Sequence, residues 1–379
     1  MKVIHKNWIL LLIASFLFSA CSPPSADSVE RIPKIPLDGE PIAEATPVAS
    51  AHFSPKLRKI EMLDEQNGWG HAEGMILRTE DGGESWLNIT PTAVDSDPVY
   101  AESVFLDEET GWILIESPNS PDVSTLFRTN DGGATWLSQN TPFGRTEIGF
   151  LDAENGYGLT SLGAAAGSMG VAIWETKNSG ESWERVFLHE VGLESSLPFS
   201  GTKNGLSFVD PLNGWVGGST PQDGFIWLYR TEDGGLSWEH QNLSMPPSYE
   251  FAQASVDAPL FFAGGQGLLP VQLRYEESAT VFYRTIDGGE NWLVTTPVAT
   301  RGKYAVASAT EIIVWDGSSE IYSSLDGGEN WTSTPSDWHP ADTLRALDFV
   351  SATHGWAISD EAGFFRTVNG GMSWEKLGE

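Results

Sequence analysis

One short pattern of polar and apolar positions occurs seven times along this chain. Each copy, which we call the first phrase, is a polar run that contains glycine and ends in a tryptophan. Its first copy, residues 78–86, reads Arg-Thr-Glu-Asp-Gly-Gly-Glu-Ser-Trp. A side-chain oxygen of Asp can accept hydrogen bonds from backbone amides two residues on, and Gly-Gly supplies positive φ at no steric cost. We therefore expect each phrase to close a tight turn between two strands, with the next strand starting at a buried Trp.

The copies differ mainly at the position of this Asp, which holds Asp in five copies and Asn in the third and seventh. Asn keeps the acceptor oxygen and loses the charge, so we expect those two turns to close as well. The closing tryptophans are 39 to 55 residues apart. This period suits one four-stranded propeller blade and is too long for most helical solenoids. The positions concerned are Asp81, Asp131, Asn178, Asp233, Asp287, Asp326 and Asn369, closed by Trp86, Trp136, Trp183, Trp238, Trp292, Trp331 and Trp374.

A second phrase precedes most copies of the first: an apolar pair and an Asp, followed a few residues later by Gly and an aromatic residue. Repeat five retains only Val256-Asp257 and Phe262, and repeat six lacks it. The clear copies are Met62-Leu63-Asp64 with Gly68-Trp69, Phe105-Leu106-Asp107 with Gly111-Trp112, Phe150-Leu151-Asp152 with Gly156-Tyr157, Phe208-Val209-Asp210 with Gly214-Trp215, and Phe349-Val350-Ser351 with Gly355-Trp356.

Together the two phrases predict four antiparallel strands, A to D, in each repeat. Strand A ends near the Asp of the second phrase, strand B starts at its Gly-Trp, strand C runs into the Arg-Thr, and strand D starts at the closing Trp. The predicted fold is all-β, a seven-bladed β-propeller of four-stranded antiparallel blades over residues 57–379. A strand from residues 45–56 could help to close the ring.

The first phrase resembles the Asp-box, or BNR repeat, of sialidases, sortilin-type receptors and the photosystem II assembly and stability factor family. The second phrase makes the resemblance closest to the last of these families, although its usual Val-Gly after the Trp appears only as Val216-Gly217. The resemblance covers about residues 57–379. It implies a propeller that chaperones or scaffolds a membrane-protein complex and needs no cofactor.

The start of the chain predicts an extracytoplasmic location. Lys2 and Lys6 precede an apolar run, and small residues then lead to Cys21, the single cysteine of the chain. This layout is that of a secretory signal peptide over residues 1–20, ending in a sequence similar to a bacterial lipobox. We expect a lipidated Cys21 to anchor the protein to a membrane, inner or outer, and the Pro-rich residues 21–56 to form a disordered tether.

Strand parity predicts two different faces for the ring. The A–B turns and the Asp-box turns share one face, which we call the box face. The B–C loops and the D–A crossovers share the other, which we call the crossover face. Because binding usually sits on variable loops, we expect it on the crossover face, in segments that include 113–126, 158–170, 217–225 and 264–280.

Charge follows the same division. With 52 acidic and 21 basic residues, the net charge is −31, which disfavours nucleic acid as a partner. Acids gather on the box turns and on the A–B turns, where we place Asp257 as well, so the box face should be strongly negative. Cationic and aromatic residues assigned to the crossover face are the candidate contacts for a membrane or cell-surface protein: Arg145, Lys203, Arg274, Tyr275, Arg301, Lys303, Trp338 and Arg345.

No catalytic residue stands out in the sequence. Arg31-Ile32-Pro33 matches a sialidase motif, but it lies in the Pro-rich tether, and the aromatic residue expected before it is Glu30. The histidines lack zinc-ligand spacing, and a dense calcium loop does not occur, so we predict no metal site. The sequence thus favours a non-catalytic binding or assembly scaffold. The alternative is a surface glycosidase of sialidase type or a carbohydrate-binding propeller, in which two carboxylates facing each other across the ring hydrolyse a glycoside.

Overall fold

Antiparallel sheets follow the seven repeats in chain order in a computed structural model of the protein. It describes residues 55–378 except 73, 93, 95–100, 118–119, 166, 339–343 and 361–362. All of them belong to the unit formed by residues 33–379. Cys21, the predicted lipidation site, and the suggested closing strand up to residue 54 therefore lie outside the described residues.

Five repeats form separate four-stranded sheets, each ordered as its strands follow along the chain. Repeat one contains β1 (Leu57–Met62), β2 (Gly68–Ala72), β3 (Met75–Thr79) and β4 (Leu87–Asn88), and repeat two contains β5 (Ala101–Phe105), β6 (Gly111–Glu116), β7 (Ser124–Thr129) and β8 (Leu137–Asn140). Repeat three contains β9 (Thr146–Phe150), β10 (Gly156–Ala165), β11 (Ser168–Thr176) and β12 (Glu184–His189). Repeat six contains β22 (Lys303–Val306), β23 (Ile312–Trp315), β24 (Glu320–Ser324) and β25 (Thr332–Pro335), and repeat seven contains β26 (Leu344–Phe349), β27 (Gly355–Ser359), β28 (Gly363–Thr367) and β29 (Glu375–Leu377).

Repeats four and five are joined in one nine-stranded sheet, because Ser219 of β14 pairs with Ser255 of β17. In repeat five, strand A is split into two short strands that both pair with β19. The strands of this sheet are β13 (Thr202–Phe208), β14 (Gly214–Ser219), β15 (Leu228–Thr231), β16 (Glu239–His240), β17 (Gln253–Val256), β18 (Leu260–Phe262), β19 (Gln266–Arg274), β20 (Ala279–Thr285) and β21 (Leu293–Val294), with a short 3-10 turn η1 (Ala263–Gly265) before β19.

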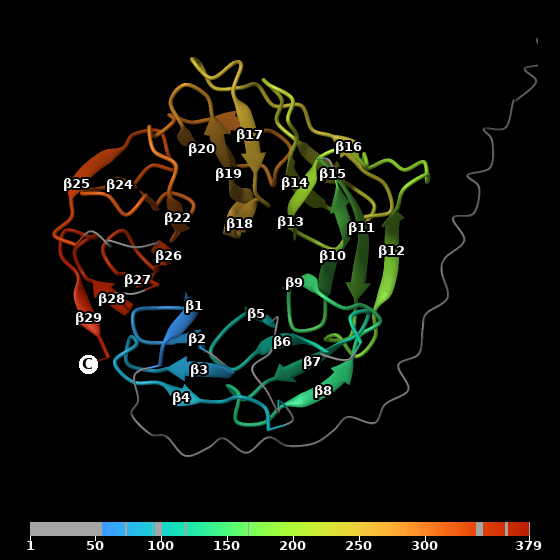
Figure 1. Cartoon of the computed structure of the whole chain (residues 1–379), viewed down its shortest axis with the longest axis horizontal. Helices are drawn as coiled ribbons and strands as arrows, with labels where there is room; N and C mark the ends of the chain where they lie inside the picture. Colours follow the sequence, from blue (N-terminus) through green and yellow to red (C-terminus); the bar gives the residue numbers. More distant parts are fainter. Residues whose placement is uncertain are drawn as a thin grey trace, which may run out of the picture. The chain divides into compact units, whose positions relative to one another are not determined.

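The sheets follow one another around a ring, with the first strand of each repeat innermost (Figure 1). Neighbouring inner strands pack against each other, as β5 does against β9 and β22 against β26. The last repeat meets the first in the same way, through β26 and β1. The predicted all-β propeller of antiparallel four-stranded blades is thus confirmed, with repeats four and five merged in one sheet.

Aromatic residues of the second phrase join neighbouring repeats. The Trp69 ring stacks on Phe105 of the next repeat at 3.9 Å between ring centroids, and Trp112 stacks on Phe150 at 3.7 Å. Trp215 meets Phe261 in the same way, but tilted, at 4.8 Å. In repeat two the phrase therefore supplies both halves of such a contact, Phe105 for repeat one and Trp112 for repeat three.

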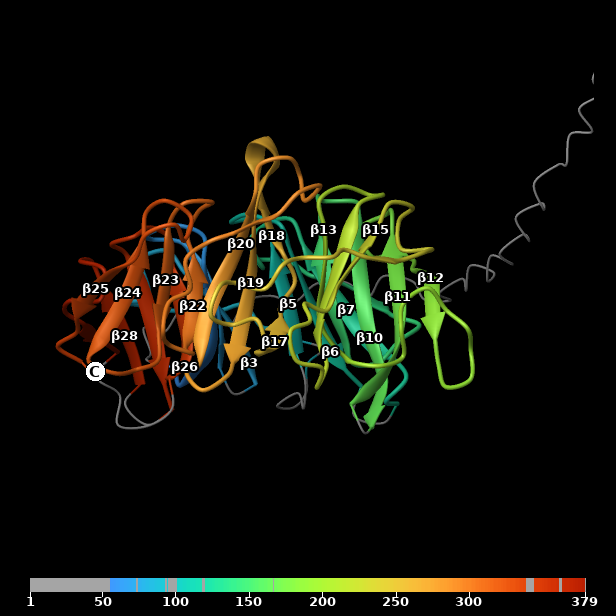
Figure 2. The same ribbon diagram turned by 90° about the horizontal axis from the view of Figure 1, so that it is seen from above.

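The two faces predicted from strand parity are present in the structure. In every repeat, a backbone N–H of the Asp-box turn donates to a carbonyl of the A–B turn, so these turns lie together. The pairs are Gly82 to Gln66, Gly132 to Glu109, Ser179 to Glu154, Gly234 to Leu212, Gly288 to Gly265, Gly327 to Thr310, and Gly370 to Thr353. Figure 2 shows the gold 3-10 turn before β19 at the upper edge and the β10–β11 hairpin reaching the lower edge.

Several expected loops are strands. Within 158–170, β10 and β11 continue to residues 165 and 168, so the variable loop is a long hairpin with a short tip. Within 264–280, β19 occupies 266–274, and its A–B turn lies on the box face. Only residues 275–278 of that segment connect strands B and C. Half of 113–126 likewise belongs to β6 and β7. Repeat five lacks the Gly-Trp that marks strand B in other repeats. The sequence analysis therefore assigned all of 264–280 to a loop of the crossover face, although most of it is strand β19.

Candidate functional site

The Asp-box turn is closed by a fixed set of hydrogen bonds, seen first in repeat one. Asp81 Oδ1 accepts from the backbone N–H of Ser85 at 2.8 Å, and Thr79 Oγ1 donates to Asp81 Oδ1 at 2.9 Å. Thr79 Oγ1 in turn accepts from the N–H of Gly83 at 2.9 Å. Gly82 and Gly83 have φ of +73° and +89°, which only glycine adopts without strain.

This geometry corrects one detail of the sequence interpretation. The box Asp accepts from the amide four residues on, whereas the bond to the amide two residues on belongs to the Asp of the second phrase. Asp64 Oδ1 accepts from the N–H groups of Gln66 and Asn67, both at 2.7 Å. The two aspartates therefore close two different turns of one repeat, and both belong to the fold.

Asn performs the task of Asp in repeats three and seven, as predicted. Asn178 Oδ1 accepts from the N–H of Ser182 at 3.0 Å, and its Nδ2 donates to Ser182 Oγ at the same distance. Asn369 makes the matching bonds with Ser373. Because the turn closes without a negative charge, the box carboxylates are hydrogen-bond acceptors and are not required as charges.

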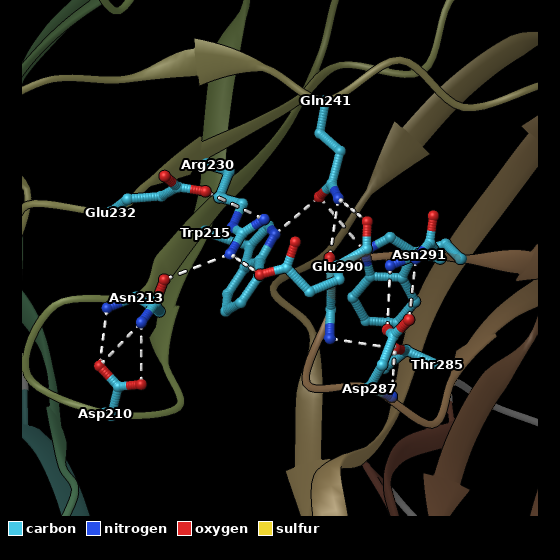
Figure 3. Close-up of polar contacts among 12 residues, drawn as sticks. Asp210, Asn213, Trp215, Arg230, Glu232, Gln241, Thr285, Asp287, Glu290 and Asn291 are labelled. Carbon is cyan, nitrogen blue, oxygen red and sulfur yellow. Dashed lines mark hydrogen bonds and ion pairs between the residues drawn. The ribbon is translucent and has the colours of Figure 1, made fainter.

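The arginine that begins a box reaches the next repeat. Arg230 Nη2 donates to Glu290 of the following box at 2.6 Å, and Arg128 pairs with Glu181 at 2.5 Å. Figure 3 shows this link beside Gln241, whose Oε1 accepts from Trp215 Nε1 at 2.7 Å and from Trp292 Nε1 at 3.2 Å. The Gln241 Nε2 donates to the carbonyl of Gly289 at 2.7 Å. The polar groups at this point of the box face thus hold repeats together.

The pKa values of the box carboxyls agree with this role. The side-chain amide of Asn291, and then its backbone N–H, hold the pKa of Asp287 below its usual value. Asn330 acts on Asp326 in the same way. These carboxyls stay ionised in neutral solution and would not act as proton donors to a substrate.

On the crossover face, four of the candidate contacts gather where repeats five and six adjoin. We call Arg274, Tyr275, Arg301 and Lys303 the basic patch. All four are exposed, and Tyr275 retains 43% of its accessible surface. Gln272 links the two repeats, accepting from Arg301 Nε at 3.0 Å and donating to the carbonyl of Gly302 at 3.2 Å. Glu276 and Glu277, also exposed, follow Tyr275 in the same turn, so the surface carries both signs of charge.

Two further candidates are exposed away from this patch. Arg145 directly precedes β9, and Arg345 lies in β26 and pairs with Asp360. Both are near the start of an inner strand, which places them on the crossover face with the basic patch. The structure therefore leaves six of the eight candidates accessible: Arg145, Arg274, Tyr275, Arg301, Lys303 and Arg345.

The prediction for Lys203 requires a correction, because its side chain is buried and is not presented to a partner on the crossover face. It is 5% exposed, and its Nζ donates to the carbonyls of Met169, Pro198 and Gly201 at 2.7 to 3.1 Å, with Phe199 and Ser200 slightly farther away. The ammonium group also lies over the Trp227 ring at 5.2 Å. Burial lowers the pKa of Lys203 to about 8, so it remains charged at pH 7.

Trp338 requires the same correction. Its ring stacks on Phe365 at 3.9 Å and meets the edges of Trp315 and Trp374 at 5.5 Å. It belongs to the apolar core of repeats six and seven. The half-buried ring of Trp338 therefore fills space between two repeats, and only part of it is open to a partner.

Acids on the inner strands were missed in the sequence. Burial raises the pKa of Glu61 in β1 to about 7, with Asp348 and Glu102 adding to the effect and Lys59 opposing it. Burial likewise raises the pKa of Asp348 in β26 to about 6, although its Oδ2 accepts from the N–H of Met62 at 2.6 Å. Glu147 lies in the inner strand β9. Its side chain keeps some contact with solvent, but desolvation by the surrounding protein, followed by the charge of Glu102, raises its pKa to about 7.

A sequence signal for two of these acids does exist: Glu61 and Asp348 each come directly before the apolar residue that opens the second phrase. Asp257 belongs to the same inner group and was misplaced on an A–B turn. It lies between β17 and β18, and its Oδ2 accepts from the Tyr304 hydroxyl at 2.7 Å. In the described residues, the acids, histidines and cysteines include no group of three arranged to hold a metal ion.

No protein-family model matches the chain. Two curated proteins do. Over 185 residues the chain is 24% identical to the Photosystem II assembly lipoprotein Ycf48 of Synechococcus sp. (strain CC9902), covering 47% of this chain and 47% of that protein. Over 259 residues it is 26% identical to a xyloglucanase of Paenibacillus sp, covering 60% of this chain and 24% of the enzyme. The chain thus spans about half and about a quarter of the length of these relatives.

Solved structures of both kinds share the fold. A structure of YCF48 bound to a D1 peptide matches with a TM-score of 0.53 at 20% identity, covering 89% of this chain and 98% of that one. The GH74 xyloglucanase of Xanthomonas campestris matches with a TM-score of 0.57 at 14% identity, covering 88% of this chain and 55% of the enzyme. The chain is a β-propeller similar to Ycf48, and the resemblance given by the two phrases is confirmed.

Proposed function

We propose that this protein is a non-catalytic, extracytoplasmic binding and assembly scaffold that acts on a membrane-protein complex. The observation that carries the proposal is the division of labour between the two faces. On the box face, the Asp residues of the box turns close those turns, and Glu181 and Glu290 link repeats. The crossover face instead presents the basic patch across repeats five and six. Arg and Tyr are enriched among the residues that anchor protein interfaces. The similarity to Ycf48, which has been solved with a D1 peptide, supports a segment of a membrane protein as the ligand.

The proposal includes a lipid anchor at Cys21 and a tether over residues 21–56. The name of the Synechococcus relative describes that protein as a lipoprotein, which supports the anchor. No helix in the described part of the chain is long and apolar enough to cross a membrane. An anchored propeller on a flexible tether would reach the extracytoplasmic parts of its partner.

Charge reversal on each face tests the proposal. The double variant Arg301→Glu/Lys303→Glu should lose capture of its partner from detergent-solubilised membranes. The control is Glu109→Lys/Glu329→Lys, two exposed acids on the box face. Capture by the native protein should also weaken as salt rises, because screening reduces a steered contact. Loss of capture in the control, with the basic-patch variant unaffected, would overturn the proposal.

A second function is favoured by one observation, the raised pKa of the inner-strand acids. Glycoside hydrolysis needs one carboxyl that holds a proton near neutral pH and a second that acts as base or nucleophile. Glu61, Glu147 and Asp348 have the raised pKa expected of the first, and a xyloglucanase is among the relatives. A screen of xyloglucan and fluorogenic glycosides decides the matter: turnover abolished by Glu61→Gln or Glu147→Gln would establish the enzyme in place of the scaffold.

A further inference from the structure

The segment that connects repeat four to repeat five buries most of its apolar side chains. Ala252 is fully buried, and Leu243, Met245 and Tyr249 pack against the core that lies across these two repeats. Phe251 is the exception, because it retains 70% of its accessible surface. It is the most exposed aromatic residue in the part of the chain that the structure describes. The segment therefore presents one large ring to solvent on the crossover face.

The backbone on both sides of Phe251 is held by hydrogen bonds. The N–H of Ala252 donates to the carbonyl of Tyr249 at 2.9 Å, and the Ala252 carbonyl accepts from the N–H of Gly224, in the B–C loop of repeat four, at 2.9 Å. Ser248 has a φ of +71°, a conformation that a residue other than glycine keeps only where its surroundings impose it. The ring is thus carried by a fixed turn, which reduces the entropy lost when it enters an interface.

The strand that follows Phe251 places it beside the basic patch. Phe251 and Gln253 are exposed, whereas Ala252 and Ala254 are buried, so alternate positions leading into β17 face outward. Gln253 lies opposite Arg274 of β19. Residues directly opposite each other in antiparallel strands project from the same side of the sheet, and Arg274 is exposed as well. Phe251 and the basic patch therefore belong to the same side of one strand pair.

The cations of this surface have no acidic partner at close range. Among the residues that the structure describes, Arg274, Arg301 and Lys303 form no ion pair, and Arg301 bonds the neutral Gln272. Arg230 on the box face, by contrast, pairs with two glutamates. The basic patch therefore offers cationic groups to the carboxylates of a ligand.

We infer that the partner presents an extended acidic segment with one large apolar side chain, which packs on Phe251 and the neighbouring Tyr275 while its carboxylates meet the basic patch. Ser255 follows Phe251 by four positions and lies opposite Gln272, the residue that holds Arg301. At about 3.3 Å per residue, the apolar and cationic ends of the surface are about 13 Å apart. The apolar side chain and the acids of the ligand should therefore be about four residues apart. This inference rests on the proposed function, because it gives the chemistry of the partner for the same surface.

Synthetic peptides test the inference by fluorescence anisotropy. The probe is a short labelled peptide with one Leu and, four residues later, two neighbouring Asp; a matched peptide has Ser in place of Leu. Phe251→Ser should weaken binding of the Leu peptide about tenfold, as expected for an interface anchor, without changing its salt dependence. The Ser peptide should bind the native protein and Phe251→Ser equally. Arg301→Glu/Lys303→Glu should weaken binding of both peptides and remove most of the salt dependence.

Val191→Ser is the matched control, because Val191 is 82% exposed on the crossover between repeats three and four. It should change neither peptide binding nor Tm, and Phe251→Ser should also keep the native Tm because its ring is exposed. Equal binding of the Leu peptide by the native protein and Phe251→Ser, or no binding of it by the native protein, would overturn the inference.

The proposed function is tested separately, by capture from solubilised membranes. If Arg301→Glu/Lys303→Glu loses capture while Phe251→Ser retains both capture and peptide binding, the proposed function stands and the inference about Phe251 is wrong. Self-association of the native protein that Phe251→Ser abolishes, measured by sedimentation, would also overturn the inference and assign Phe251 to a contact between two copies of the chain.

Discussion

Arg366 donates to Glu84, which lies 282 positions earlier in the chain, at 3.1 Å. Arg128 and Glu181, and Arg230 and Glu290, make the same link between successive repeats. Beside the Arg366–Glu84 pair, Trp356 Nε1 donates to the carbonyl of Gly82 at 2.8 Å. Repeat seven therefore contacts repeat one in the way that other repeats contact the next repeat along the chain. The ring is closed by contacts that recur elsewhere in the molecule.

Loss of this closing link should destabilise the protein measurably. Arg366 is 20% exposed and bonds both Glu84 and Glu375, so Arg366→Gln should lower the free energy of unfolding by roughly 1 kcal/mol, above the usual value for a surface pair. Urea unfolding at low and high salt gives the measurement. Lys177→Gln serves as control, because the pair of Lys177 with Glu175 lies within one repeat. Equal losses in the two variants would contradict the closing role.

The box Trp and the box Asp should differ strongly in their contribution to stability. Trp238 is 2% exposed, and Trp238→Ala should cost roughly 3–5 kcal/mol as a large truncation in the core. Asp233→Asn should cost less than about 1 kcal/mol, because Asn178 and Asn369 close the same turn. Chemical denaturation of both variants checks the comparison. Similar losses would show that the charge of Asp233 is needed.

Stability should depend on pH through Glu61. Its pKa is raised to about 7 in the folded protein, so the folded state holds a proton that the unfolded state releases above about pH 4.5. The native protein therefore loses stability as pH rises from 4.5 to 7. Glu61→Gln should equal the native protein at pH 4 and exceed it at pH 8, by about 1–3 kcal/mol. Thermal unfolding across this range gives the answer, with exposed Glu329→Gln as the control that should show no such trend.

Anchoring should depend on one residue. Cys21→Ser should abolish labelling by a fatty-acid analogue and move the protein from the membrane fraction to the soluble fraction. Cell fractionation with metabolic labelling measures both. Ser22→Ala, which leaves the cysteine in place, is the control. Membrane association that persists in Cys21→Ser without lipid label would require a different means of attachment.

The fold was predictable because its signal is repeated and local. Seven turn phrases with a closing Trp define strands C and D, and the Gly-Trp phrase defines strand B. Where that second phrase fails, in repeat five, β19 was mistaken for a loop and Asp257 for a turn residue. Local signals could not show the merging of repeats four and five either, because it depends on Ser219 and Ser255, which lie far apart in the sequence.

The candidate site was only partly predictable for a related reason. Strand parity placed Arg274, Arg301 and Lys303 correctly at the crossover face. It could not show that Lys203 folds inward, because the carbonyls that surround its ammonium belong to the crossover 198–201 and to Met169. Nor could it show that Trp338 packs on Phe365. Position in the chain gives the face of the ring, whereas burial is decided by contacts with other repeats.

The pairing of Ser219 with Ser255 makes one joint of the ring unlike the other six. There, strands of two repeats pair in one sheet, while at other described joints the backbone hydrogen bonds run between a strand or turn and a connecting segment, as from the N–H of Gly201 to the carbonyl of Gly167 at 2.8 Å. Repeats four and five should consequently move as one rigid body in the thermal motion of the ring. Separation of neighbouring repeats should begin at another joint. The basic patch lies at the border of that body with repeat six, so small rotations there would change the spacing between Arg274 and Arg301, and with it the surface offered to a partner.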